Sequence, residues 1–193
     1  MKERPIIFQG EMVRAILDGR KTQTRRPIKP QPENGHYIDH CHWNKSGWAF
    51  WKNGGCTCVG THSPPAFEGD RLWVRETFGE DYCGDFFSTP KGSGQKAQIV
   101  YRADGHDMSE CGTGWRPSIH MPREASRITL EVTEVRVERV QDISEEDARA
   151  EGPLLSDKII NCTYRDAFMG LWDSIYQDWV CNRWVWVVRF KVL

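Results

Sequence analysis

The chain has 193 residues, of which 39% are hydrophobic and nine are tryptophan, which is enough for a packed core and excludes global disorder. The formal net charge of −1 excludes a broadly basic coat for nucleic acid but leaves room for a local basic patch. No apolar run approaches the roughly 18 residues that span a membrane, and the first residues lack the apolar stretch of a signal peptide. Seven cysteines without a repeating spacing fit reduced thiols, so we expect a cytoplasmic protein with one domain over residues 1–193.

The first predicted elements are a short strand at residues 5–8 and a helix at residues 11–18. Gly19 follows this helix where a left-handed C-cap is favoured, so the helix is expected to end there. The helix is predicted from four apolar residues at the spacing of one helical face: Met12, Val13, Ile16 and Leu17.

Cations and hydroxyls are concentrated directly after this helix. No acid occurs between Asp18 and Glu33, whereas five cations do, and a solvated surface would normally mix both signs. The segment, expected to run as a strand or tight loop, therefore predicts a site for an anion or a nucleotide-like ligand.

Two stretches differ from the rest of the chain, at about 30–66 and 79–96. Both are rich in glycine, and the first also in proline, so we interpret them as long, loop-rich insertions. Between them, residues 71–77 are predicted to form a strand that buries Leu72 and Val74 and carries Glu76 near its end.

Cysteines and histidines cluster in the first insertion and offer more ligands than a zinc site needs. Their spacing is Cys-x-Cys rather than a pair of Cys-x₂-Cys knuckles, so we predict neither a metal nor a cofactor. The alternative is a structural zinc bound by Cys41, Cys56, Cys58 and His62.

The second half of the chain combines strands and helices. A strand is predicted at 98–101, a proline-bounded loop at 111–123, helices at 144–152 and 163–179, and a final strand at 184–192.

The longest predicted strand covers residues 126–140, and its apolar residues change parity after Val132. One face cannot bury both sets, so a bulge or bend is expected near Thr133. The pattern as a whole favours an α+β fold, with a small mixed or closed β-barrel and flanking helices.

The pairing of residues 16–26 with residues 69–76 resembles the ASCH domain, a PUA-like β-barrel, and the clear matches cover residues 5–28, 67–78 and 115–152. The long form, with its Trp-Arg-Pro-Ser-Ile-His-Met-Pro-Arg stretch, is similar to proteins of phages and prophages. Some small ASCH proteins are amidohydrolases of N4-acetylcytidine, and others are regarded as RNA-binding modules. The resemblance implies that the catalytic lysine, threonine and glutamate correspond to Lys21, Thr24 and Glu76.

These three residue types suit the hydrolysis of an amide. The Thr24 hydroxyl needs a base to take its proton, and the Lys21 amine can do so if burial and nearby cations lower its pKa. Glu76 can orient the lysine or carry a proton to the leaving nitrogen. The residues expected to bind the substrate are Arg20, Thr22, Arg25, Arg26, Trp73, Arg75, Trp115, Ser118, His120 and Arg123.

Several interpretations remain open at this point. The same cleft can bind a nucleoside, a nucleotide or RNA without turnover, and the chain can instead act through protein contacts during phage growth. Lys21 and Glu76 can form a purely structural ion pair. Strand register decides whether Thr22 or Thr24 faces the cleft.

Overall fold

The computed structural model describes residues 1–32, 63–81, 98–107, 114–155 and 162–193, together with the backbone of four two-residue strands. These strands pair as β3 with β6 and β4 with β5. The predicted insertions at 30–66 and 79–96 lie largely outside the described residues. The four strands are β3 (His36–Tyr37), β4 (Trp43–Asn44), β5 (Gly47–Trp48) and β6 (Trp51–Lys52).

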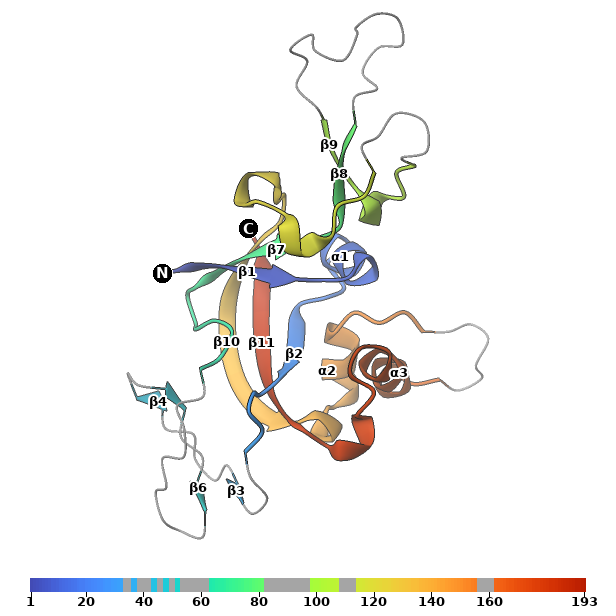
Figure 1. The fold of residues 1–193 in the computed structure, drawn as a ribbon. Helices are drawn as coiled ribbons and strands as arrows, with labels where there is room; N and C mark the ends of the chain where they lie inside the picture. The colour runs from blue at the N-terminus through green and yellow to red at the C-terminus, as the bar shows by residue number, and fades with distance from the viewer. Residues whose placement is uncertain are drawn as a thin grey trace, which may run out of the picture.

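The central element is a five-stranded sheet in the order β1-β7-β10-β11-β2 (Figure 1). β1 runs parallel to β7, and the other three pairings are antiparallel. The fold is therefore α+β, as predicted. The strands are β1 (Glu3–Ile7), β7 (Arg71–Arg75), β10 (Thr129–Arg139), β11 (Trp184–Val192) and β2 (Gln23–Pro27).

The described strands do not form a closed barrel, which corrects the expectation of closure. β1 and β2 are the outer strands of the sheet and do not pair with each other. Instead of a ladder of backbone hydrogen bonds, a side chain links them, because Nη2 of Arg26 donates to the carbonyl of Ile7 over 2.6 Å.

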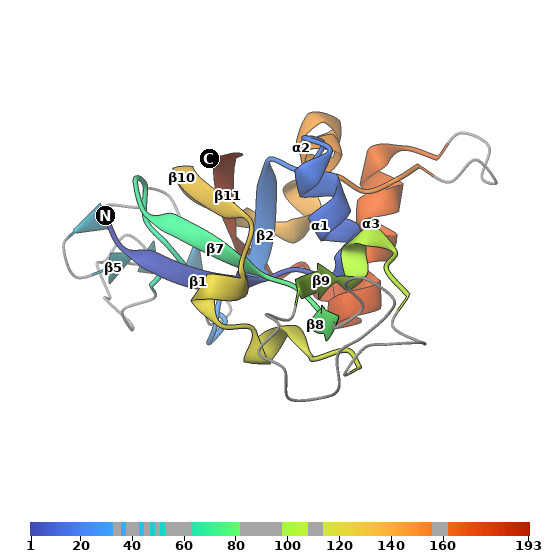
Figure 2. The same cartoon turned by 90° about the horizontal axis from the view of Figure 1, so that it is seen from above.

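Three helices pack around the sheet, and the two views show α2 and α3 side by side (Figures 1 and 2). They are α1 (Gly10–Leu17), α2 (Glu145–Ala150) and α3 (Tyr164–Tyr176). α2 begins as predicted at Ser144, whose hydroxyl accepts from the backbone N–H of Asp147. α3 begins with a capping box between Thr163 and Asp166, and it ends three residues before the predicted Trp179.

The helices cover two cores, which lie on opposite sides of the sheet. α1 buries Val13 and Ile16 against one side of the sheet, whereas Leu17 of the predicted stripe is 49% exposed. α2 and α3 pack Phe168 and Trp172 against the other side, which includes Val185 and Val187 of β11. The middle of β11 is thus buried on both faces.

The long strand β10 contains the predicted bulge. Val132 pairs with Phe190 and Glu134 with Arg189, so Thr133 is an extra residue without a partner on β11. The core residues Leu130 and Val132 precede it, and Val135 follows it. The extra residue therefore moves the apolar side chains from even to odd positions.

A separate hairpin follows β7 and is formed by β8 (Phe78–Asp81) and β9 (Gln98–Tyr101). The predicted loop before β10 is held by two 3₁₀ turns, Ser118–His120 and Arg123–Ala125. Its Arg116 forms a bridge with Phe78, so this segment packs beside the hairpin.

Candidate functional site

Lys21 is a buried lysine between α1 and β2. After α1 ends, Gly19 adopts a positive φ of 71°, and the backbone N–H of Lys21 then donates to the carbonyl of Ala15 over 2.9 Å. The turn directs the side chain inward, where only 1% of Lys21 is exposed. Its Nζ lies 5.7 Å from the centre of the Phe8 ring.

The partner of Lys21 is Glu151, directly after α2. Nζ donates to the carbonyl oxygen and to the carboxylate Oε2 of Glu151, each over 2.8 Å. Burial lowers the pKa of Lys21 from its ordinary value; Glu151 opposes this effect, and the charges of Arg26 and Arg25 add to it. A lysine with these surroundings is a candidate base.

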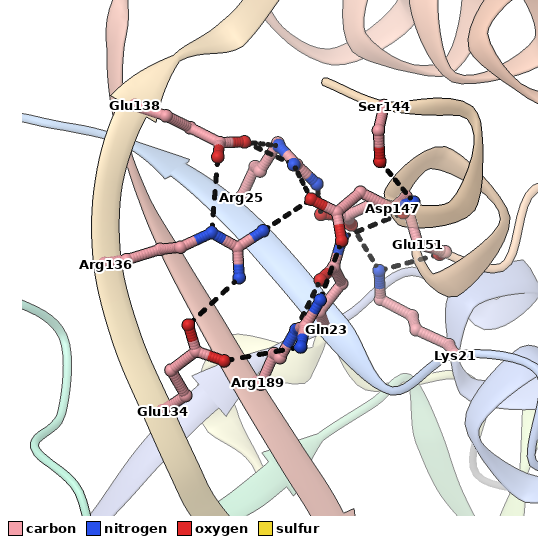
Figure 3. Close-up of polar contacts among 10 residues, drawn as sticks. All are labelled: Lys21, Gln23, Arg25, Glu134, Arg136, Glu138, Ser144, Asp147, Glu151 and Arg189. Atoms are coloured by element: carbon pink, nitrogen blue, oxygen red, sulfur yellow. Dashed lines mark hydrogen bonds and ion pairs between the residues drawn. The ribbon is translucent and has the colours of Figure 1, made fainter. Parts of the chain in front are cut away.

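Arg25 joins Glu151 to a larger group of charges (Figure 3). Its Nη1 donates to Oε1 of Glu151 over 3.0 Å, and its other nitrogens contact Glu138 and Asp147. Arg25 and Gln23 share one face of β2, which turns toward α2. We call the whole set the charge cluster: Lys21, Arg25, Arg136, Arg189, Glu134, Glu138, Asp147 and Glu151.

Glu76 is buried at the end of β7, with 1% of the residue exposed. Arg127 donates to it twice, from Nε to Oε1 over 2.9 Å and from Nη2 to Oε2 over 3.1 Å. Burial raises the pKa of Glu76, and the hydrogen bonds and charge of Arg127 offset this only in part. Arg127 also binds Asp104 and stacks 3.9 Å from the centre of the Tyr101 ring.

Phe8 connects the surroundings of Lys21 and Glu76. Its ring faces the Lys21 amine, and its backbone N–H donates over 3.2 Å to the carbonyl of Arg75, the residue before Glu76. Each of the two buried groups nevertheless has its own ion-pair partner, Glu151 for Lys21 and Arg127 for Glu76. Among the described residues, Glu151 rather than Glu76 orients the lysine.

The two threonines of the basic stretch differ in burial. Thr24 is 4% exposed and pairs with Val188 of β11, on the face of β2 opposite to Arg25. Arg26 shares the face of Thr24 and lies 5.3 Å from the centre of the Phe8 ring. Thr22 is exposed, so the buried hydroxyl of the basic stretch is that of Thr24.

Cavities flank the two ends of this region. One of about 370 Å³ is bounded by Glu76 and Thr77, by Arg102 and by the first turn of α1 with Arg14. Another, of about 490 Å³, lies beside the predicted ligand residues Arg20 and Thr22. Both are of a size that ligand pockets have.

The three arginines of the basic stretch differ in their burial and in their partners. Arg20 binds Asp18 and donates over 2.8 Å to the carbonyl of Gly152, at the edge of the cavity of about 490 Å³. Arg26 is half-buried and contacts Phe8. Arg25, expected to bind substrate, is 3% exposed, and its guanidinium is surrounded by carboxylates.

The remaining predicted ligand residues fall into two groups. Trp73 is 9% exposed and lies near two guanidinium groups, 4.7 Å from Arg75 and 6.0 Å from Arg123. Arg123 is also held by Glu3 and Thr129. The second group belongs to the segment that bridges to Phe78: Trp115 and Ser118 are half-buried, and His120 is exposed.

Glu151 and Arg127 were not singled out from the sequence. Glu151 is 130 residues from Lys21 and lies within the predicted helix at 144–152, where nothing in the sequence distinguishes it from the other acids. Gly152 has a φ of 79°, and a Cβ placed on it would lie 2.8 Å from Cβ of Lys21. This glycine allows the chain to pass directly over the lysine.

In the part of the chain that the structure describes, no group of three or more His, Cys, Asp or Glu side chains is arranged to hold a metal ion. Cys41, Cys56, Cys58 and His62, the alternative zinc ligands, lie outside the described residues. No described helix is long and apolar enough to cross a lipid bilayer.

Comparison of this chain with protein-family models, with curated proteins and with solved structures finds no match.

Proposed function

We propose that this protein is an ASCH-type amidohydrolase in the cytoplasm that removes an acyl group from the exocyclic nitrogen of a nucleobase. The observation that supports it is a pair of buried groups, Lys21 and Glu76: the Phe8 ring faces the Lys21 amine, and the Phe8 backbone bonds to the residue before Glu76. The pKa of Lys21 is lowered and that of Glu76 is raised, both by burial in the first place. Opposite displacements of this kind are typical of a base and an acid that work together.

The chemistry assigns one role to each residue. The neutral Lys21 amine takes the proton of the Thr24 hydroxyl, and the oxygen attacks the acyl carbon. The carbon–nitrogen bond then breaks while protonated Glu76 gives its proton to the leaving amine. Water then attacks the acyl-threonine and gives a proton to Glu76, the Lys21 ammonium returns its proton to the departing Thr24 oxygen, and the carboxylic acid is released. No cofactor is needed, and the resemblance to the ASCH domain suggests N4-acetylcytidine as the first substrate to test.

Binding without turnover is the second candidate. The observation that favours it is the Lys21–Glu151 ion pair, because a lysine held as an ammonium cannot take a proton from Thr24. The ligand is then a nucleoside, a nucleotide or RNA that contacts the outward-facing cations of the basic stretch, such as Arg20. Phosphate contacts make such binding dependent on salt.

The test is incubation of the pure protein with N4-acetylcytidine, followed by chromatography for cytidine. We expect turnover by the wild type, and a decrease in kcat of about 10²–10⁴-fold in Lys21→Ala and in Glu76→Gln, as for the loss of a positioned proton carrier. Lys191→Ala is the matched control, because Lys191 is an exposed lysine whose side chain is 58% accessible. If the protein binds N4-acetylcytidine but forms no cytidine even at high enzyme concentration, the proposal of a hydrolase is refuted and binding without turnover is supported.

A further inference from the structure

Glu151 accepts two hydrogen bonds from Lys21, and the residue after it makes a third contact. Its carbonyl and its Oε2 both accept from Nζ, and the next residue, Gly152, packs directly over the aliphatic part of the lysine. Glu151 is itself 3% exposed, so water does not compete for its carboxylate. The direction in which the Lys21 amine points is therefore fixed by a single residue.

The carboxylate of Glu151 is held from its other side. Oε1 accepts from Nη1 of Arg25, and the same guanidinium contacts Glu138 and Asp147. Figure 3 shows that Glu151 is linked to the Lys21 amine and to Arg25, and that Asp147 lies beside it. The carboxylate cannot follow a moving lysine without leaving Arg25, so the lysine has one favoured position.

We infer that Glu151 is a positioning residue for Lys21, which holds the amine beside Phe8 and governs its protonation. A role of Glu151 in catalysis rests on the proposed function. Its effect on the position and protonation of Lys21 rests on the contacts alone. Neither the sequence nor the resemblance assigns Glu151 a role.

The charges that face Lys21 determine the sign of the effect. Glu151 faces it from the end of α2, Arg25 and Arg26 face it from β2, and the uncharged Phe8 ring faces it from the segment after β1. Burial and both arginines favour the neutral amine, and only Glu151 favours the ammonium. Removal of the Glu151 charge is therefore expected to make the lysine titrate at lower pH.

The experiment compares Glu151→Gln with Glu138→Gln. Both variants remove a carboxylate from Arg25, but only Glu151 contacts Lys21, which makes Glu138→Gln the matched control. The readouts are the ¹³Cε titration of Lys21 by NMR, assigned by its absence in Lys21→Arg, and the pH profile of kcat/KM on N4-acetylcytidine. In Glu151→Gln we expect the NMR midpoint to fall by about 1–3 pH units, with an equal shift of the acidic limb of the profile. In Glu138→Gln we expect both midpoints to stay at their wild-type positions.

An unchanged NMR midpoint in Glu151→Gln overturns the inference, and so does an equal shift in Glu138→Gln, which would assign the effect to the whole charge cluster. If circular dichroism shows that Glu151→Gln is unfolded, the Glu151→Asp variant tests the inference in its place. It keeps the charge but withdraws it by one methylene, so turnover should fall while the midpoint changes little, and full turnover contradicts positioning. A shifted midpoint in an enzyme that hydrolyses nothing supports control of Lys21 by Glu151 and refutes the proposed function.

Discussion

Arg127 and Glu76 are joined by two parallel hydrogen bonds of 2.9 and 3.1 Å, although their exposure differs greatly. The Glu76 side chain is 2% accessible and the Arg127 side chain 25%. The arginine thus lies between solvent and a carboxylate that would otherwise be buried without a cation. Loss of that cation would favour the protonated form of the Glu76 carboxyl further.

Arg127→Gln is expected to raise the pKa of Glu76 further, because burial remains while the opposing hydrogen bonds and charge are lost. A carboxyl whose pKa is raised above its unfolded value of 4.5 destabilises the fold above its folded pKa, and the loss is relieved as the pH falls toward 4.5. We expect the variant to lose about 1–3 kcal/mol of unfolding free energy at pH 8, and less at pH 5. Urea unfolding at both pH values measures this.

Arg123→Gln is the control for that comparison, since Arg123 pairs with Glu3 at an exposed site. Its loss should be about 0–1 kcal/mol at both pH values. Equal losses in the two variants at pH 8 would mean that Arg127 does not stabilise a buried charge.

Gly152→Ala is expected to destabilise the fold and to displace Lys21. The new Cβ would lie 2.8 Å from Cβ of Lys21 and 3.0 Å from Cβ of Ala15, in a backbone conformation with φ at 79°. Strain and overpacking together predict a loss of about 2–5 kcal/mol in urea unfolding. Gly19→Ala is the matched control, because Gly19 has a φ of 71° but open space around it, so only about 1–2 kcal/mol should be lost. Similar losses at both glycines would contradict the close approach to Lys21.

Arg25→Met is expected to be among the most destabilising changes in the charge cluster. Arg25 is 3% exposed, and its removal leaves Glu138, Asp147 and Glu151 without their shared cation. Loss of one partner from a buried ion pair predicts about 3–5 kcal/mol, measured by chemical denaturation at pH 7. Arg189→Met, at a side chain 47% exposed that also contacts Asp147, should lose about 0–1 kcal/mol. The reverse order would refute the central position of Arg25.

Asp147 is expected to contribute to unfolding in acid. Burial opposes its ionisation, but the Arg189 hydrogen bond and the charges of Arg136 and Arg25 outweigh this and hold its pKa below the ordinary 3.8. The resulting stability is present above pH 3.8 and is lost as the pH falls through the lower folded pKa. Asp147→Asn should therefore be less stable than the wild type at pH 6 and should lose less on acidification. Thermal unfolding from pH 6 down to pH 2 tests this, with the exposed Asp18→Asn as control.

Local patterns predicted much of the fold correctly. The end of α1 at Gly19, the Ser144 cap and the bulge near Thr133 each follow from residues that are neighbours in sequence. The prediction of a closed barrel was wrong. Closure depends on whether β1 and β2 pair, and these two strands, which α1 separates in the sequence, are opposite edges of the sheet. Pairing between distant edges leaves no local trace in a sequence.

The candidate site was predictable in part. Lys21, Thr24 and Glu76 are all buried, which meets the condition set for a lowered pKa of Lys21, whereas their catalytic roles stay predictions. Their partners were not predictable, because Glu151 comes from a helix end 130 residues away and Arg127 from a loop 51 residues away. Many acids and arginines in the chain could have filled these positions, and only the packing of α2 and of the segment before β10 selects among them.

The extra residue in β10 has a consequence for the tolerance of the gene to small deletions. Because side chains alternate along a strand, the extra residue Thr133 changes the face on which the even-numbered side chains lie. Glu134, Arg136 and Glu138 therefore point toward α2, and the odd-numbered Val135 and Val137 point to the apolar interior. Loss of this one codon would remove the bulge and join Val132 directly to Glu134, so that the three charges and the two valines would keep their faces in a regular strand. A second residue inserted beside Thr133, in a strand that keeps its one-residue bulge, would instead direct the three charges inward and the two valines outward, so this position should tolerate a deletion better than an insertion.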